Sequence, residues 1–370
     1  MPLILYGYRV LLMKILWLAH RDPLHPRAGG AERTLLEITT RLVLMGHEVV
    51  ILTVRWKGSK ATDILNNVKV IRFGNTLFYH LFTPIFLIKF KPSIAVNDLG
   101  QAVPWLSTTV LRQKSIVFFR HLHSRSLPGQ VGRPLAKLIT SIEKAYFLIY
   151  PNRTFVTESS TSKSDLIKIG INEDKIILNP PGVDLQKYNL YDKSQIPTVV
   201  YFGGFRKYKR PLETVAIFKE ISLRMGEVRF IFIGNGPEIL KVKSMVKKCR
   251  IDDKTIFTGK LEEFELAKMI SQSWLNVHTS ITEGWGLSII EAAASGTPTV
   301  AYEVPGVVDT IVNGMNGFKI RDLDREAFVE AALRILNDPF KWETTSRKVA
   351  EKYSWDKAAD VWSQLIGNLN

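Results

Sequence analysis

The chain reads Thr282-Glu283-Gly284-Trp285-Gly286-Leu287-Ser288-Ile289-Ile290-Glu291, so two acids stand eight residues apart across a glycine-rich turn. A helix beginning at about Leu287 leaves its first backbone N–H groups without helical partners and adds partial positive charge, which suits a phosphate. Glu291, one turn inside that helix, could accept hydrogen bonds from ribose hydroxyls, and Glu283 could reach a hydroxylated group beyond the phosphate. The stretch predicts a sugar-nucleotide site, although an acid near a helix start is also a common structural partner of the dipole.

The residues that follow favour the first interpretation. Ala292 to Ser295 are typical of a small-residue helix, Gly296 of its end, and Thr299 to Ala301 of a buried strand. The whole run resembles the E-x7-E region of glycosyltransferase family 4. That resemblance implies retaining enzymes of the GT-B fold, in which two doubly wound, Rossmann-like α/β domains enclose a cleft with the active site.

Composition is compatible with such a protein. A length of 370 residues predicts two domains, and 46% hydrophobic with 23% charged residues is ordinary for a globular chain. The single cysteine, Cys249, excludes an intramolecular disulfide and suits a reducing compartment. The net charge of +15 implies an anionic partner, but its scattered cations do not favour nucleic acid. The sequence contains no charge-free run long enough to span a membrane.

Strand-like and helix-like segments alternate along the chain, which predicts parallel sheets covered on both faces. We expect an N-terminal acceptor-binding domain over residues 1–188, with 1–12 as a possible extension if Met13 is the start. A nucleotide-sugar-binding domain is expected over 189–353. By resemblance, the last helix, 354–370, crosses back to the first domain.

In the first half, Gly29 and Gly30 open a predicted helix after the first strand. They do not complete a dinucleotide fingerprint, because the first glycine of that motif and a following acid are missing. The resemblance implies that this loop lies against the donor phosphate and the acceptor. His47, after the helix stop Gly46, is predicted to be a surface residue without chemistry.

A histidine pair follows the predicted strand Ser115–Phe119. The resemblance implies that His121 lies near the donor sugar, with His123 as the competitor, while the pair alone lacks a third metal ligand. The basic and apolar stretch 125–150 is predicted to form an amphipathic helix packed on the sheet, or alternatively a surface facing anionic lipid. Acceptor recognition is expected in loops over 75–91 and 124–133.

In the second half, a predicted strand over 198–202 runs into a glycine- and cation-rich loop, which predicts a phosphate cradle. The family pattern of G-R followed five residues later by lysine is matched by Lys209, whereas Gly204 replaces the arginine. Arg206 is the expected substitute. By resemblance, Lys260 and Leu261 lie near the nucleotide base. His278 is predicted to be structural.

These residues predict a metal-independent transfer. Lys209, Arg206 and the amides of Gly284, Trp285, Gly286 and Leu287 would stabilise charge on a leaving diphosphate. The D-x-D of Asp322 and Asp324 is predicted to be a surface or capping feature. By resemblance, the enzyme retains anomeric configuration through front-side attack. We expect no cofactor, a UDP- or GDP-sugar donor, and a glycan or lipid-linked acceptor. The expected location is cytoplasmic, possibly peripheral on an anionic membrane. A sugar-nucleotide 2-epimerase and a non-catalytic sugar-nucleotide-binding subunit remain the alternatives.

Overall fold

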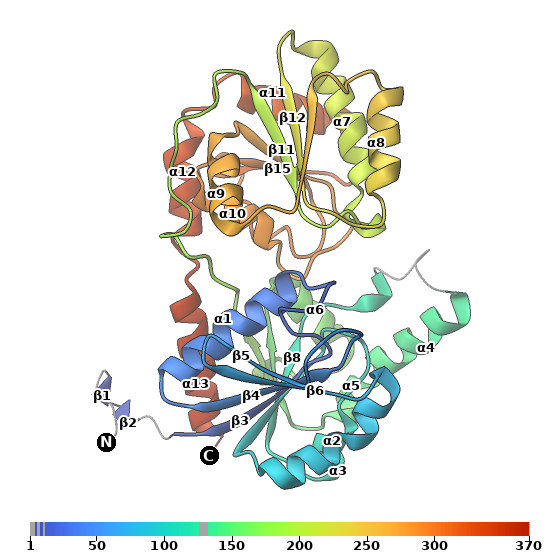
Figure 1. Ribbon diagram of the computed structural model, residues 1–370, viewed down its shortest axis with the longest axis vertical. Helices are drawn as coiled ribbons and strands as arrows, with labels where there is room; N and C mark the ends of the chain where they lie inside the picture. The colour runs from blue at the N-terminus through green and yellow to red at the C-terminus, as the bar shows by residue number, and fades with distance from the viewer. Residues whose placement is uncertain (1–3, 6–7, 10–11, 126–131, 370) are drawn as a thin grey trace. The chain divides into compact units, whose positions relative to one another are not determined.

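The computed structural model describes residues 4–5, 8–9, 12–125 and 132–369, and it divides into two compact units (Figure 1). Unit 1 comprises Met1–Gly182 with Trp355–Asn370, and unit 2 comprises Val183–Ser354. Each unit is built on one main sheet whose central strands are buried along their whole length. No helix in the described ranges combines the length and the apolar character needed to cross a membrane.

The sheet of unit 1 has the strand order β10-β9-β8-β7-β3-β4-β6-β5, and all neighbours are parallel except β5 and β6. Its strands are β3 (Lys14–Leu18), β4 (Glu48–Val54), β5 (Thr62–Leu65), β6 (Val68–Phe73), β7 (Ile94–Asp98), β8 (Ser115–Phe119), β9 (Thr154–Thr157) and β10 (Ile176–Leu178). A separate antiparallel pair is formed by β1 (Ile4–Leu5) and β2 (Tyr8–Arg9).

Alternation along the central strand β3 explains why helices cover both faces. Ile15 and Trp17 join one apolar cluster, whereas Leu16 and Leu18 join the cluster on the opposite face, as the period of two in a strand requires. The helices of unit 1 are α1 (Gly30–Leu44), α2 (Thr76–Phe90), α3 (Leu106–Val110), η1 (His123–Arg125), α4 (Arg133–Lys144), α5 (Tyr146–Ile149), α6 (Ser160–Lys168), η2 (Glu173–Lys175) and α13 (Trp355–Asn368).

The last helix, α13, belongs to the core of unit 1. It runs beside α1 in Figure 1, and its Trp362 packs 4.8 Å from Trp17 and 5.0 Å from Phe118 between ring centroids. Arg41 of α1 also bonds Asp356 at 2.6 Å. Through these contacts, α13 packs on strands and a helix that come from the first third of the chain.

Unit 2 carries an all-parallel sheet of order β13-β12-β11-β14-β15-β16. Its strands are β11 (Thr198–Phe202), β12 (Arg229–Ile233), β13 (Thr255–Gly259), β14 (Leu275–His278), β15 (Thr299–Tyr302) and β16 (Gly317–Ile320). Its helices are η3 (Lys207–Lys209), α7 (Pro211–Arg224), α8 (Ile239–Lys248), α9 (Glu263–Gln272), α10 (Leu287–Ala294), α11 (Arg325–Leu336) and α12 (Trp342–Ala350). Residues of α7, α8 and α11 pack on one face, and residues of α9 and α10 on the other.

One expectation about a segment of unit 1 was wrong, and two others fall partly outside the described residues. Residues 75–91 were expected to be a loop, but 76–90 form α2, an apolar helix that accommodates Pro84 inside it. The second expected acceptor loop, 124–133, lies partly outside the described residues, as does part of the possible extension 1–12. The β5–β6 hairpin was not predicted, although Asn66 and Asn67 at its turn adopt the positive φ angles typical of such turns.

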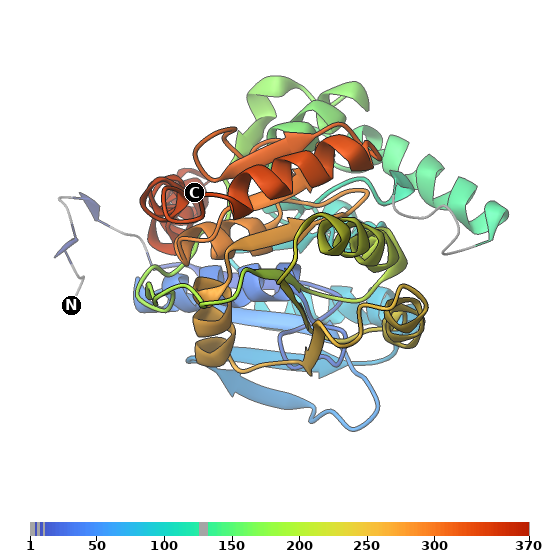
Figure 2. The same ribbon diagram turned by 90° about the horizontal axis from the view of Figure 1, so that it is seen from above.

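Two further expectations need correction. His47 is not a surface residue: it is buried, contacts the Met13 N–H at 3.2 Å and lies 3.2 Å from the Ser363 hydroxyl of α13. The amphipathic helix α4 does not pack along the sheet. It extends away from the sheet in both views, and Glu143 is its only buried side chain (Figures 1 and 2). The period of apolar residues predicts that a helix has an apolar face, but it does not predict whether other elements cover that face.

We expect Trp362→Ala to destabilise unit 1 by about 3–5 kcal/mol, because truncation of a fully buried tryptophan removes apolar contacts and leaves a cavity. Urea unfolding followed by circular dichroism measures the loss. Gln364→Ala, at an exposed position of the same helix, is the matched control and should change stability by less than about 0.5 kcal/mol. Equal stability of Trp362→Ala and wild type would contradict the assignment of α13 to this core.

Candidate functional site

The chemically richest part of unit 2 lies at the carboxyl ends of β11 and β14. Lys209, at the end of η3, donates to the Glu283 carboxylate at 2.5 Å, and His278, the last residue of β14, lies 3.1 Å from the same carboxylate oxygen. The Nδ1 of His278 lies 3.4 Å from the Ser288 hydroxyl in α10. Lys209 from η3, His278 from the end of β14 and Glu283 from the loop between β14 and α10 therefore form a single cluster.

The cluster holds Glu283 ionised. Burial alone would raise the pKa of this carboxyl, but the charge of Lys209 and the hydrogen bond from His278 outweigh it and keep the pKa well below its ordinary value. The pKa of Lys209 is raised, since Glu283 overcomes the burial that would lower it. His278, which was predicted to be structural, contacts the acid directly. Its position at the end of a strand, five residues before Glu283, is the feature of the sequence that could have indicated this contact.

Helix α10 begins at Leu287, as expected from the sequence. Gly286 is its N-cap at a φ of +96°, a left-handed conformation that glycine adopts without steric cost. Glu291 lies one turn inside and is 8% exposed. The Trp285 side chain packs in a buried cluster against Tyr353, so only its backbone is available to a ligand.

The backbone of Glu283 is fixed by the loop after β15. Its N–H donates to the Pro305 carbonyl at 2.9 Å. A Cβ at Gly306 would come within 2.3 Å of the Glu283 carbonyl oxygen, so this close approach requires glycine. These contacts fix the backbone of Glu283, and the contacts with Lys209 and His278 fix its carboxylate.

Arg206, the expected substitute for the arginine, lies beside Gly204. Its side chain passes 3.7 Å from the position that a Cβ of residue 204 would occupy, so the guanidinium stem runs beside Gly204. The same loop is bonded to the loop after β12 through the Phe205 N–H and the Asn235 carbonyl. Lys260 is exposed and Leu261 half-buried directly after β13, at the same edge of the sheet.

In unit 1, the strand ends are organised by Arg120, which directly follows β8 and was not predicted to be a site residue. Its buried guanidinium bonds Asp98 at 2.8 Å, Glu158 at 2.6 Å and the Ala31 carbonyl at 3.2 Å. Burial would lower the pKa of Arg120, but the two carboxylates outweigh it and raise it. Arg120 therefore ties β7 and β8 to the start of α1.

The first turn of α1 is held locally as well. The Gly29 N–H donates to the Glu32 carboxylate at 2.7 Å, and the helix begins at Gly30. This contact satisfies one of the backbone donors at the helix start. Gly29 and Gly30 thus lie on the turn that Arg120 fixes, at the carboxyl end of the neighbouring strands.

The two histidines after β8 differ in their surroundings. The Nε2 of His123 lies 3.2 Å from the Gly100 carbonyl oxygen, and Nδ1 lies 3.3 Å from Glu143, which also accepts the His123 N–H. His121 is half-buried, with its ring centroid 4.8 Å from that of His123. His123 is thus engaged in holding α4.

The acids of the D-x-D are engaged with the protein. Asp322 forms an ion pair with Arg210, and the Asp324 side chain accepts from the Ala327 N–H as the N-cap of α11. Within the described ranges, no group of three or more His, Cys, Asp or Glu side chains is arranged to hold a metal ion.

Comparisons with known proteins cover both units. The model "Glycosyltransferase Family 4" matches residues 28–187, and "Glycosyl transferases group 1" matches residues 186–354. Among curated relatives, N-acetyl-alpha-D-glucosaminyl L-malate synthase of Bacillus anthracis is 24% identical, over 85% of this chain and 86% of its own length. The phosphatidylinositol N-acetylglucosaminyltransferase gpi3 subunit of Schizosaccharomyces pombe is 20% identical, over 94% and 79%.

Solved structures show the same fold. Sucrose-phosphate synthase of Thermosynechococcus elongatus matches with a TM-score of 0.79 at 21% identity, over 95% of this chain and 97% of its own. Anabaena Alr3699/HepE, solved with UDP and glucose, matches with a TM-score of 0.76 at 15% identity, over 96% and 100%. The GT-B fold expected from the sequence is confirmed. With both family models and full-length relatives in agreement, the chain belongs to glycosyltransferase family 4.

Proposed function

We propose that the protein is a retaining glycosyltransferase that moves a sugar from a nucleotide-diphosphate donor to a hydroxyl group of a lipid-linked or glycan acceptor. The Lys209–Glu283–His278 cluster beside the start of α10 carries this proposal. It combines a cation and helix amides for a diphosphate with an ionised acid for a sugar hydroxyl. Glu291 is assigned to the ribose hydroxyls, and His121 to the neighbourhood of the donor sugar.

In this mechanism the protein binds and stabilises charge. As the bond between the anomeric carbon and the diphosphate breaks, Lys209, Arg206 and the backbone amides of 284–287 hold the negative charge that develops on the leaving group. The acceptor oxygen bonds the same face of the anomeric carbon, and its proton passes to the leaving phosphate. Glu283, fixed by Pro305 and His278, keeps the sugar oriented without needing a metal ion.

The named relatives support the donor and acceptor classes. One is a GDP-mannose-dependent mannosyltransferase acting on a phosphatidylinositol monomannoside, from Mycobacterium tuberculosis, 24% identical over 90% of this chain. HepE binds UDP and glucose. A UDP- or GDP-sugar donor therefore fits the proposal best. Lipid-linked acceptors would place the protein peripherally on the cytoplasmic face of a membrane.

We expect one class of UDP-, GDP- or ADP-sugar to raise the melting temperature of the protein, since ligand at 100 times its Kd adds about 2.7 kcal/mol of stability. Glu291→Ala should lose most of that stabilisation because the ribose contact is removed. Glu351→Ala, at an exposed acid of unit 2, is the control and should keep it. Stabilisation by no nucleotide sugar would contradict the proposed donor site. An inverted anomeric configuration in the product, measured by proton NMR coupling, would contradict the mechanism.

The partly buried pair of Lys209 and Glu283 allows effects on stability and on activity to be measured separately. Lys209→Met should cost about 1–3 kcal/mol of stability, because it removes a charged hydrogen-bond partner and leaves the Glu283 carboxylate with His278, and it should abolish transfer. The double change Lys209→Met with Glu283→Gln should recover much of the stability and none of the transfer. Urea unfolding and product formation measure the two effects. Lys207→Met, at the exposed start of η3, is the control; activity in the double variant would count against both assignments.

An exposed apolar surface on unit 1 supports membrane contact. Leu135 and Leu138 of α4 are 49% and 57% exposed, and Lys137 lies between them. Beside this helix, a groove of about 720 Å³ is lined by Leu81, Leu106, Ile142 and Ile149. Apolar side chains interspersed with cations bind the surface of anionic lipid bilayers.

We expect the protein to sediment with vesicles containing anionic lipid, less so at high salt, because both charge and apolar area contribute. The double variant Leu135→Asp with Leu138→Asp should lose most of this binding. Leu223→Asp, at a position 70% exposed on α7 of unit 2, is the matched control. Equal sedimentation of wild type and the α4 variant would show that α4 does not contact lipid.

A further inference from the structure

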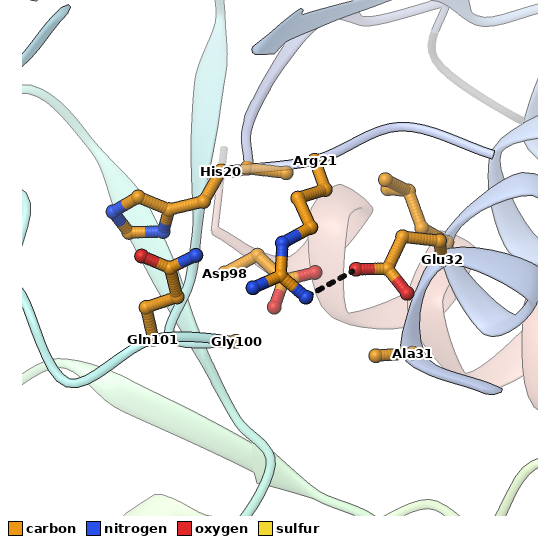
Figure 3. A pocket seen from close by; sticks show the side chains of 9 residues that line it. His20, Arg21, Ala31, Glu32, Asp98, Gly100 and Gln101 are labelled. Atoms are coloured by element: carbon orange, nitrogen blue, oxygen red, sulfur yellow. Dashed lines mark ion pairs between the residues drawn. The ribbon is translucent and has the colours of Figure 1, made fainter. Parts of the chain in front are cut away.

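A small polar cavity lies in unit 1 at the carboxyl ends of β3 and β7, beside the start of α1 (Figure 3). Its volume is about 20 Å³, which is room for one water molecule or one functional group of a ligand. In Figure 3 the His20 ring and the Gln101 amide lie on one side of it, and Arg21 faces Glu32 on the other. Arg21 and Glu32 form an ion pair at 3.9 Å.

His20 is the unusual member of this lining. It is 5% exposed, and its Nε2 lies 3.0 Å from Nε2 of His80 in α2. Trp105 packs on both rings, with centroids 4.8 Å from His20 and 4.4 Å from His80. The Nδ1 atom of His20, by contrast, is buried without a hydrogen-bond partner. A buried polar atom without a partner costs free energy, and a ligand group could satisfy it.

The contact with His80 determines whether Nδ1 of His20 is a hydrogen-bond donor or an acceptor. Burial keeps the pKa of His20 well below 6.5 and lowers that of His80 to about 4, so both rings are neutral at pH 7. In the Nε2–Nε2 contact, one of the two neutral rings then donates a proton and the other accepts it. Buried N–H groups without partners are rarer than buried acceptors, which favours the proton on Nε2 of His20. Its Nδ1 is then an acceptor aimed at the cavity.

A hydrogen-bond acceptor at the position of Nδ1 restricts which functional group of a ligand can bind in the cavity. A carboxylate oxygen has no proton to donate to Nδ1. An ammonium group, which Asp98 and Glu32 in the lining would attract, could donate to Nδ1 but has no lone pair to accept from the donors of Arg21 and Gln101. A hydroxyl both donates to Nδ1 and accepts from a neighbouring donor such as the Gln101 amide or Arg21. We propose that this cavity binds one hydroxyl group of the acceptor substrate and that Nδ1 of His20 accepts its hydrogen bond. This assignment rests on the proposed transferase function and names a specificity residue for it.

The two amide replacements of histidine test the assignment directly. His20→Asn places a polar atom near the position of Nδ1, whereas His20→Gln places it near Nε2. Binding is measured by saturation-transfer NMR with myo-inositol 1-phosphate, sn-glycerol 3-phosphate and L-malate, which all carry hydroxyls. We expect at least one probe to bind, with affinity reduced tenfold or more by His20→Gln and less than threefold by His20→Asn. His25→Gln, in the same loop but outside the cavity lining, is the control.

Two readouts keep the outcomes distinct. Nucleotide-sugar stabilisation is measured in the same variants and reports folding and the donor site: its absence in wild type overturns the proposed function. If it is intact in all variants while His20→Gln binds the probes as wild type does, the cavity assignment is overturned. Binding of none of the probes to wild type, or of succinate as well as L-malate, also overturns it. Nitrogen-15 shifts of His20 should report an unprotonated Nδ1.

Discussion

A parallel strand buried on both faces has one place for polar chemistry, which is its carboxyl end. In unit 2 every strand is parallel to its neighbours, and strands such as β11 and β14 are buried along their whole length. Polar side chains that follow these strands therefore gather at one edge of the sheet. Lys209 and Glu283, 74 residues apart in sequence, meet there as an ion pair for this reason.

Charge at both sheet edges is compensated inside the protein. Arg120 is buried with two carboxylates in unit 1, and Glu283 is partly buried with one lysine in unit 2. Isolated buried charges are costly, whereas paired ones remain ionised. The two clusters nevertheless differ in use. Arg120 donates its hydrogen bonds to Asp98, Glu158 and a backbone carbonyl, so its role is to hold the strand ends together. Glu283 contacts Lys209 and His278 through the same carboxylate oxygen, and it belongs to the proposed donor site.

Much of this organisation could be predicted from sequence, because its signals are local. The glycine before Leu287, the acid eight residues beyond Glu283, and the cation-rich loop after β11 each stand within a short window. What could not be predicted depends on distant packing. His47 is buried by a helix that comes more than 300 residues later, and His20 meets His80 across 60 residues. Helix α2 was missed because Pro84 and a continuous apolar run hide its period.

The placement of α13 has a consequence for biosynthesis. A chain leaves the ribosome from its N-terminus, at about 5–20 residues per second. The β3–β8 face that Trp362 covers is complete once β8 has emerged at Phe119, yet its covering helix begins only at Trp355. About 10–50 s therefore pass before Trp362 can pack on the rings of Trp17 and Phe118. During this time the apolar face is exposed to chaperones or to premature association.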